Sequence, residues 1–198
     1  ISPALLRELA DHPPGIPWYG FARIDDRLAE PGFCRQLRQA GCVMLKLGIE
    51  SGSQRVLDGM NKGIDVDQVS KTLQALAGAG IATYVYLLFG TPEESIEAAR
   101  ETLAFTAGHH HCITFLNLAI FNLPVGSPEA AGLEITGRHT DDLSLYHDFR
   151  HPLDWSRREI RLFLDREFKR QPAIRRIIQR DPPFFTSNHA AFFIRPTD

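Results

Sequence analysis

The chain has 198 residues, of which 43% are hydrophobic, and a formal net charge of -2 at pH 7. This composition excludes an intrinsically disordered chain and is sufficient for one sizeable hydrophobic core. Neither an apolar run long enough to span a bilayer nor the pattern of a secretory signal is visible, so we expect a soluble cytoplasmic protein. The odd cysteine set, Cys34, Cys42 and Cys112, has neither disulfide-framework nor compact metal-site spacing, which predicts reduced thiols.

Helix signals alternate with apolar runs along the first two thirds of the chain. Ser2 followed by Pro3 predicts a first helix, and glycines at 41 and 80 are placed to end two later ones. The segments "LRQAGCVMLKLG" and "LAGAGIATYVYLLFG" repeat one helix-to-strand unit. The pattern predicts helices over residues 2–15, 31–41, 65–80 and 93–107, and strands over residues 16–25, 42–49, 81–89 and 112–124.

Apolar strands that alternate with amphipathic helices indicate a parallel sheet, because each crossover helix covers one face. Four such units fit the α/β class, as half of a (β/α) barrel or as a small doubly wound sheet. In both folds the ligands bind at the carboxyl ends of the strands. Polar residues gather at these predicted ends: Arg23 and Asp25, then residues 50–53, then residues 90–93, then Asn122.

The last third of the chain differs in character. Residues 135–155 are polar and rich in His and Asp, which predicts a loop or irregular insertion. Residues 156–180 predict one or two helices with a buried apolar face, and "FFTSNHAAFFIR", residues 184–195, predicts a final strand. We therefore divide the chain into a partial barrel, residues 1–128, and a C-terminal extension, residues 129–198. The apolar helical face consists of Ile160, Phe163, Leu164 and Phe168.

Several polar clusters offer weaker functional readings. The triplet His109 to His111 and the set His139, Asp141, Asp142, His147, Asp148 and His151 have metal-compatible chemistry. Adjacent imidazoles rarely converge on one ion, and the looser set favours a solvated loop or a substrate-side lid. The arginines from Arg157 to Arg180 favour a solvated helix face over RNA binding, because acidic residues dilute them.

The segment "GIESGSQRVLDGMNKG", residues 48–63, resembles the fourth-strand region of radical S-adenosylmethionine (radical SAM) enzymes. "FARID" with the later "QAGC" is similar to the third-strand segment of that family, "AGIATYVYLLFGTPEES" to the fifth, and "FNLPVGSP" to the sixth. The four matches occur in family order between residues 18 and 128. The resemblance implies the second half of a TIM-like catalytic barrel.

One family element has no counterpart here. Members hold a 4Fe-4S cluster with a Cys-x-x-x-Cys-x-x-Cys loop after the first barrel strand, and no segment of this chain has that spacing. We expect the cluster and S-adenosylmethionine in the full-length protein, with the N-terminal half of the barrel as partner, and neither bound by this chain alone. The resemblance also implies an optional cobalamin-binding domain, with an unknown substrate. The alternative is a non-catalytic binding or regulatory half-barrel.

The resemblance implies roles for the strand-end residues. Glu50 and Ser51 would meet a ribose, and Arg23 would hold the methionyl carboxylate. Gly90, with Leu88 before it and Glu93 three residues after, would receive adenine. The structural alternatives are an N-cap at Ser51 or Ser53, an ion pair between Arg23 and Asp25, and a plain turn at Gly90. The cofactor-binding residues implied in this way are Arg23, Glu50, Ser51, Gly52, Ser53, Leu88, Gly90 and Asn122.

The predicted first strand has an unpaired edge near Trp18, because the preceding barrel strand is missing from this chain. Unpaired edges bind other strands unless they are covered. We expect self-association through this edge, or its covering by residues 184–195.

Overall fold

The computed structural model describes residues 1–137, 144–181 and 190–194. A four-stranded parallel sheet forms its centre, in the order β1-β2-β3-β4. The strand order follows the chain order, as expected for successive helix-to-strand units, and confirms the predicted partial (β/α) barrel. The strands are β1 (Trp18–Ala22), β2 (Cys42–Glu50), β3 (Ala82–Phe89) and β4 (Phe115–Ile120).

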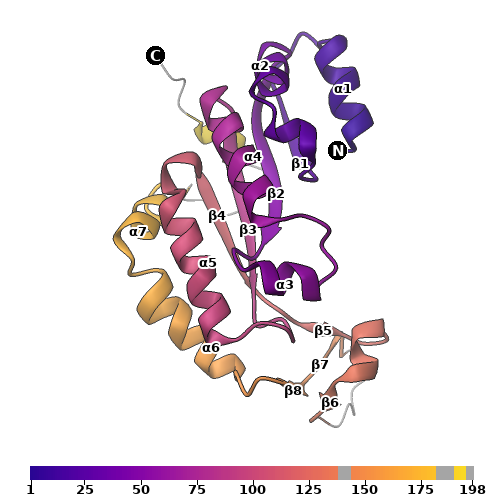
Figure 1. Cartoon of the computed structure of the whole chain (residues 1–198), viewed down its shortest axis with the longest axis vertical. Coiled ribbons are helices and arrows are strands. Elements are labelled where there is room, and N and C mark those ends of the chain that lie inside the picture. The colour runs from indigo at the N-terminus through magenta and orange to yellow at the C-terminus, as the bar shows by residue number, and fades with distance from the viewer. Residues whose placement is uncertain (138–143, 182–189, 195–198) are drawn as a thin grey trace.

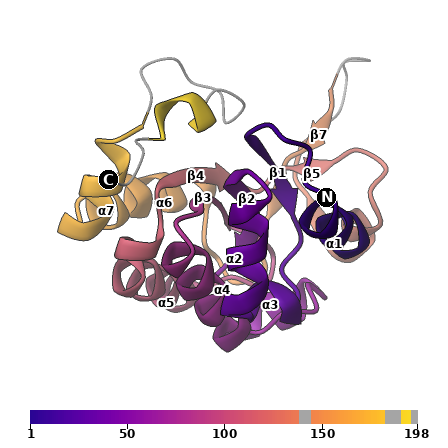
Figure 2. The same cartoon turned by 90° about the horizontal axis from the view of Figure 1, so that it is seen from above.

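The crossover helices lie on one face of this sheet (Figures 1 and 2). Gly41 and Gly80 have φ values of 93° and 71°, the left-handed conformation that the predicted helix ends require. The Ser2 hydroxyl accepts a hydrogen bond from Leu5 N at 3.2 Å, which confirms the first predicted N-cap. The helices of this part are α1 (Pro3–Asp11), α2 (Pro31–Gln39), α3 (Gln54–Gly59), α4 (Val66–Gly78) and α5 (Ile96–Gly108), with short 3-10 turns at Asp26–Ala29 and His110–Cys112.

The alternation of side chains along β2 divides the interior into two clusters. Leu45, Leu47 and Ile49 join the large core between the sheet and the helices. Met44 faces the other side, where it packs with Tyr84 and Phe115. Both faces of the sheet therefore carry buried apolar side chains, as the sequence pattern predicts for parallel strands, with the buried Lys46 as a charged exception.

The start of the C-terminal extension is largely irregular, as predicted. Its ladders are two residues long and antiparallel: β7 pairs with β5, which precedes the extension, and β6 pairs with β8. His139, Asp141 and Asp142 lie outside the described residues. The elements of this part are β5 (Leu123–Pro124), a 3-10 turn at Pro128–Gly132, β6 (Glu134–Ile135), β7 (Tyr146–His147) and β8 (Phe149–Arg150).

The following helices return to the main core (Figure 1). They are α6 (Arg157–Phe163), a π-helical turn (Leu164–Phe168) and α7 (Pro172–Ile178). The predicted apolar face, including Ile160 and Phe168, is buried in the same cluster as the sheet. Arg100 of α5 also forms an ion pair with Glu167, 3.1 Å between Nε and Oε2. The extension thus shares one hydrophobic core with the barrel half.

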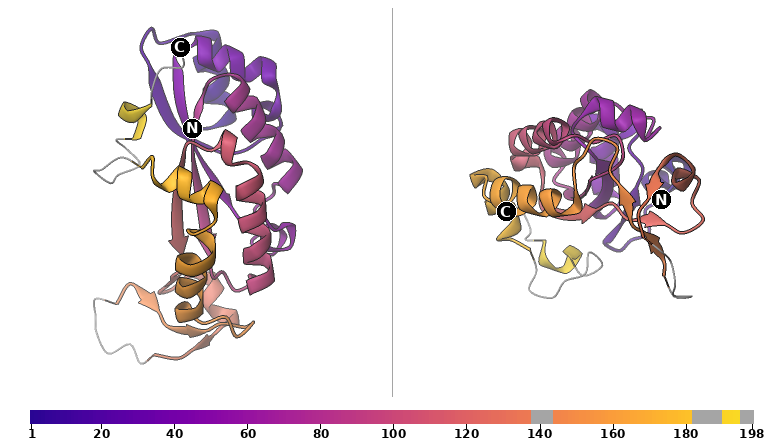
Figure 3. Two further views of the ribbon diagram at one scale, coloured as in Figure 1. Left: turned by 90° about the vertical axis from the view of Figure 1, so that its left-hand side faces the viewer. Right: turned by 90° about the horizontal axis from the view of Figure 1, so that it is seen from below.

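The predicted final strand is wrong where the structure describes it, because residues Ala190–Phe193 form a 3-10 turn. A strand needs a hydrogen-bonding neighbour, whereas this turn lies across the face of the sheet and buries Ala190 against Tyr84. Figure 3 shows the turn on the side of the sheet opposite α4 and α5. Residues 184–189 of the predicted strand lie outside the described part.

Of the segment predicted to cover the outer edge of β1, the described residues, 190–194, do not pair with it. Among the described residues no strand pairs with it, and the turn at Ala190–Phe193 packs on Met44, Tyr84 and Phe115 of the other strands. The amino group of Ile1 donates a hydrogen bond to the carbonyl of Phe21 on this strand. No helix in the described part of the chain has the length and hydropathy of a membrane span.

Candidate functional site

The strand ends bring the predicted residues to one edge of the sheet, where they divide into separate groups. Arg23 follows β1 and lines a pocket of about 450 Å³ together with Gly48 and Lys62, and Glu50, the last residue of β2, contacts this pocket through Lys62. Gly90 and Asn122 follow β3 and β4 and line a second pocket of about 250 Å³. Leu88 is half-buried near the end of β3.

An ion pair between Glu50 and Lys62 lies beside the first pocket. Lys62 Nζ lies 2.7 Å from Glu50 Oε1, and the two side chains are 28% and 21% exposed. Arg23 Nη2 donates to the carbonyl of Lys62 at 3.4 Å. The alternative partner of Arg23 is occupied elsewhere, because Asp25 Oδ1 accepts from Leu28 N at 3.1 Å and caps a 3-10 turn. The pocket is therefore lined by two cations, Arg23 and Lys62, and the half-buried carboxylate of Glu50 lies behind Lys62.

The local backbone holds this carboxylate over the sheet. Glu50 has φ 68°, unusual for a residue with a side chain, and its carboxylate folds back above Gly48. A Cβ on residue 48 would lie 2.7 Å from Glu50 Oε1 and 3.5 Å from Lys62 Nζ. Glycine at this position thus makes room for the ion pair.

Ser51, Gly52 and Ser53 turn away from the first pocket and toward α5. Ser51 Oγ and Gly52 N each lie 3.0 Å from Thr102 Oγ1, and Ser51 Oγ accepts from Ser53 N at 3.1 Å. Both serines are buried. Ser53 occupies the N-cap position of α3, but its hydroxyl forms no cap hydrogen bond. These hydrogen bonds attach the loop to α5. Glu50 instead directs its carboxylate toward Lys62, beside the first pocket.

A buried carboxylate supports the turn after β3. Gly90 has φ 78°, and its N–H donates to Glu94 Oε2 at 2.5 Å. Burial raises the pKa of Glu94 to about 8, against the smaller opposing effect of the Gly90 hydrogen bond. Sequence reasoning selected Glu93 at this turn, but Glu93 is half-buried beside Gly59 and Glu94 makes the contact.

Substitution of Glu94 by glutamine is expected to flatten the pH dependence of stability. The folded state keeps its proton to about pH 8, whereas an unfolded glutamate releases it near pH 4.3. Stability of the unaltered chain should therefore fall as pH rises between these values, by on the order of 1 kcal/mol per pH unit, and level off above them. Urea unfolding at about pH 5.5 and about pH 8.5 measures the difference.

The control for this experiment is Glu101→Gln, which alters an exposed glutamate on α5. It should keep the slope of the unaltered chain. Parallel profiles for Glu94→Gln and the unaltered chain would show that Glu94 is ionised in the folded protein.

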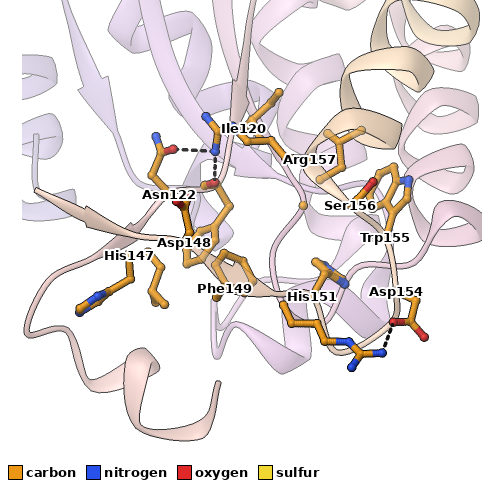
Figure 4. Close-up of a pocket in the computed structure, with 15 residues that line it drawn as sticks. Ile120, Asn122, His147, Asp148, Phe149, His151, Asp154, Trp155, Ser156 and Arg157 are labelled. Atoms are coloured by element: carbon orange, nitrogen blue, oxygen red, sulfur yellow. Dashed lines mark hydrogen bonds and ion pairs between the residues drawn. The ribbon is translucent and has the colours of Figure 1, made fainter. Parts of the chain in front are cut away.

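The second pocket lies between the end of β4 and residues 147–157 of the extension (Figure 4). Arg157 Nη1 donates to Asn122 Oδ1 at 2.8 Å and to the carbonyl of Phe121 at 3.2 Å. His151 is 7% exposed. Its Nδ1 accepts from Leu153 N at 3.2 Å, so its Nε2 donates to the carbonyl of Thr91 at 2.8 Å. Both ring nitrogens of His151 are therefore occupied by the fold.

The described residues do not fit an iron-sulfur cluster or another multi-ligand metal site. No group of three His, Cys, Asp or Glu side chains within them could hold a metal ion. Cys34, Cys42 and Cys112 are free and buried, and burial raises the pKa of both Cys34 and Cys42 to about 12. Such thiols resist the deprotonation that ligation needs. His109 is bonded to Ser70 at 2.8 Å and does not converge with its neighbours on one point.

Comparisons with known proteins bear on the family and the fold of this chain. The family model described as the radical SAM superfamily matches residues 7–106. The anaerobic magnesium-protoporphyrin IX monomethyl ester cyclase of Rubrivivax gelatinosus is 30% identical over 95 residues, 48% of this chain and 17% of the relative. The chain thus spans about a sixth of that curated relative.

Two solved structures share the fold. Coproporphyrinogen III oxidase (HemN) from Escherichia coli, a radical SAM enzyme, aligns with TM-score 0.53 and 18% identity over 82% of this chain and 36% of its own. The radical SAM methyltransferase TsrM from Kitasatospora setae, solved with cobalamin and a [4Fe-4S] cluster, aligns with TM-score 0.50 and 21% identity over 61% of this chain and 25% of its own.

Proposed function

Because the chain belongs to the radical SAM superfamily, we propose that it forms the second half of the catalytic barrel of an enzyme that cleaves S-adenosylmethionine. The observation that carries the proposal is the half-buried Glu50–Lys62 pair, which lies beside Arg23 at the carboxyl ends of β1 and β2. This is the edge of a (β/α) barrel at which ligands bind. In the bound enzyme, the cluster and cofactor together supply a reductively generated radical.

The residues of this chain bind and orient the cofactor. Glu50 accepts hydrogen bonds from the ribose hydroxyls, and Arg23 holds the methionyl carboxylate with its planar donors. Lys62 holds the Glu50 carboxylate in position over Gly48, a role that the 2.7 Å contact supports. Leu88 and the turn at Gly90 supply the apolar and backbone contacts of the adenine.

The remaining parts of the site come from outside this chain. The three buried cysteines do not fit the cluster, so its thiolates come from the preceding half of the barrel. That half packs on the inner sheet face, where Tyr19 and Phe21 are 37% and 51% exposed. A cobalamin-binding domain is an additional partner, supported by the fold shared with TsrM. The unpaired edge of β1 can also drive self-association of the isolated chain.

The proposed organisation keeps the barrel half at residues 1–128 and the extension at residues 129–198. Reduced cysteines support a cytoplasmic location.

The second candidate function is a non-catalytic binding half-barrel. It is favoured by one observation, that the described residues contain no cysteine set that fits a cluster, because fold alone does not guarantee activity.

Anaerobic reconstitution with iron and sulfide separates the two candidates. The 198-residue chain alone is expected to bind no stoichiometric cluster, since its thiols do not converge. The full-length protein is expected to bind one and, with S-adenosylmethionine and dithionite, to release 5′-deoxyadenosine. A full-length protein without a cluster and without this product would support the binding domain. A stoichiometric cluster on the short chain would contradict the assignment of its cysteines.

A further inference from the structure

We propose that the second pocket, called the extension pocket here, binds a small aromatic carboxylate next to the proposed cofactor site, with which it shares the turn at Gly90. It is formed by the strand-end residues Gly90 and 120–123 together with residues 147–151, 154–157 and Ile160. The proposal rests on the proposed function in one respect, since this ligand would be the substrate class of the enzyme. Three features of the pocket carry the inference.

The first feature is a frame that is fixed by contacts distant in sequence. His151 connects the extension to Thr91 through its Nε2–H, sixty residues away. Ile160 packs on Gly90, where its Cδ1 occupies the space that a Cβ at position 90 would take. Trp155 is buried, and its ring lies 5.9 Å from that of Phe163. The walls of the pocket are therefore built into the core.

The second feature is a cation that is held in place without a carboxylate partner. Arg157 reaches from the start of α6 to the end of β4, where its Nη1 binds two neutral acceptors (Figure 4). Within the described residues no acidic side chain lies within ion-pair distance of it. Arg150, on the same pocket, has two such partners, Glu134 at 3.9 Å and Asp154 at 3.4 Å.

The remaining donors of Arg157 suit a carboxylate. A guanidinium has five N–H groups in a planar fork, and the two bonds formed here use one nitrogen. The nearby acid Asp148 lies against Gly137, with its Oδ2 3.5 Å from the position of a Cβ there. A carboxylate ligand that accepts from the remaining N–H groups of Arg157 would form charge-assisted hydrogen bonds.

The third feature is a set of aromatic rings beside this cation. Phe121 and Phe149 meet edge to face with their ring centroids 5.9 Å apart, and Phe149 lies 6.3 Å from His151. Flat apolar walls favour a planar ring through offset or edge contacts. The pocket volume of about 250 Å³ is below the range of drug-sized sites, which indicates a compound of one or two rings.

Calorimetric titration of the 198-residue chain with 2-naphthoate tests the proposal, with 2-naphthylmethanol as the neutral probe of the same shape. We expect naphthoate to bind the unaltered chain at least about tenfold more tightly than the alcohol, the effect of a charged hydrogen bond. Arg157→Met should remove this difference. The matched control is Arg158→Met, because Arg158 is exposed and lies outside the pocket.

Equal naphthoate affinity of Arg157→Met and Arg158→Met would overturn the proposal, as would the absence of naphthoate binding to the unaltered chain. If Arg157→Met fails to fold, the comparison of the two probes on the unaltered chain still decides. Glu50→Ala separates this inference from the proposed cofactor site. If Glu50→Ala leaves the naphthoate affinity unchanged, the result supports binding in the extension pocket. If Glu50→Ala lowers the naphthoate affinity as much as Arg157→Met does, the ligand binds at the first pocket and the proposal is overturned.

Discussion

Replacement of Glu50 by alanine is expected to weaken S-adenosylmethionine binding by the full-length protein by about ten- to a hundredfold. The substitution removes a charged hydrogen-bond acceptor, which contributes about 1.5 to 3 kcal/mol. It also leaves Lys62, 28% exposed, without the carboxylate that lies 2.7 Å away. Arg23→Ala should have an effect of the same size, because it removes the proposed donor to the methionyl carboxylate. Titration calorimetry under anaerobic conditions measures both.

Glu101→Ala is the matched control, because Glu101 is an exposed glutamate on α5 away from the pocket. Its affinity should equal that of the unaltered protein. Thermal unfolding of each variant separates lost binding from lost structure, since the left-handed conformation of Glu50, φ 68°, strains alanine as well. Unchanged affinity of both Glu50→Ala and Arg23→Ala would assign these residues to structure alone.

Phe168→Ala is expected to destabilise the whole chain, not only its extension. Phe168 is fully buried, and its ring contacts those of Phe89, 5.2 Å between centroids, and Phe163, 6.2 Å. Truncation of a buried phenylalanine costs about 3 to 5 kcal/mol because it leaves a cavity. The melting temperature should fall by roughly 6 to 20 °C in a chain of this size.

Leu162→Ala is the control for Phe168→Ala, because Leu162 is also an apolar residue of the extension but is exposed on α6. Its effect should stay within about 0.5 kcal/mol, as for most surface substitutions. A single cooperative transition for Phe168→Ala at a lower temperature is the expected form of the result. Loss of the extension signal alone, with the sheet melting as before, would show that the two parts unfold separately.

The elements of the fold could be predicted from the sequence because their signals are local. Helix starts such as Ser2 and helix ends such as Gly41 and Gly80 are encoded by one or two residues. The alternation along β2 indicates which side chains face the helices. The polar residues after each strand lie at one edge of the sheet, as predicted, because parallel strands end on one side.

The detailed partners at that edge could not be predicted in the same way. Ser51 contacts Thr102, and Arg157 contacts Asn122, across 51 and 35 residues. No local pattern encodes such pairs. Lys62 carries a charge opposite to that of Glu50, which is a weak signal without the fold. Glu93 and Glu94 are adjacent in the sequence, and the conformation of the turn after Gly90 determines which of them accepts the hydrogen bond from Gly90 N. The strand predicted at residues 184–195 failed at its described end because propensity does not supply a neighbouring strand.

The strand order of the sheet has a consequence for folding kinetics. Each strand pairs with the one before it in the chain, so the helix-to-strand units can form one after another, with loop closures of moderate length. The contacts between His151 and Thr91, and between Phe168 and Phe89, join segments that are far apart and can close only when β3 is in place. We expect the extension to pack onto the sheet late in folding, after β3 has formed. Substitutions in α6 should then accelerate unfolding while they leave the folding rate nearly unchanged.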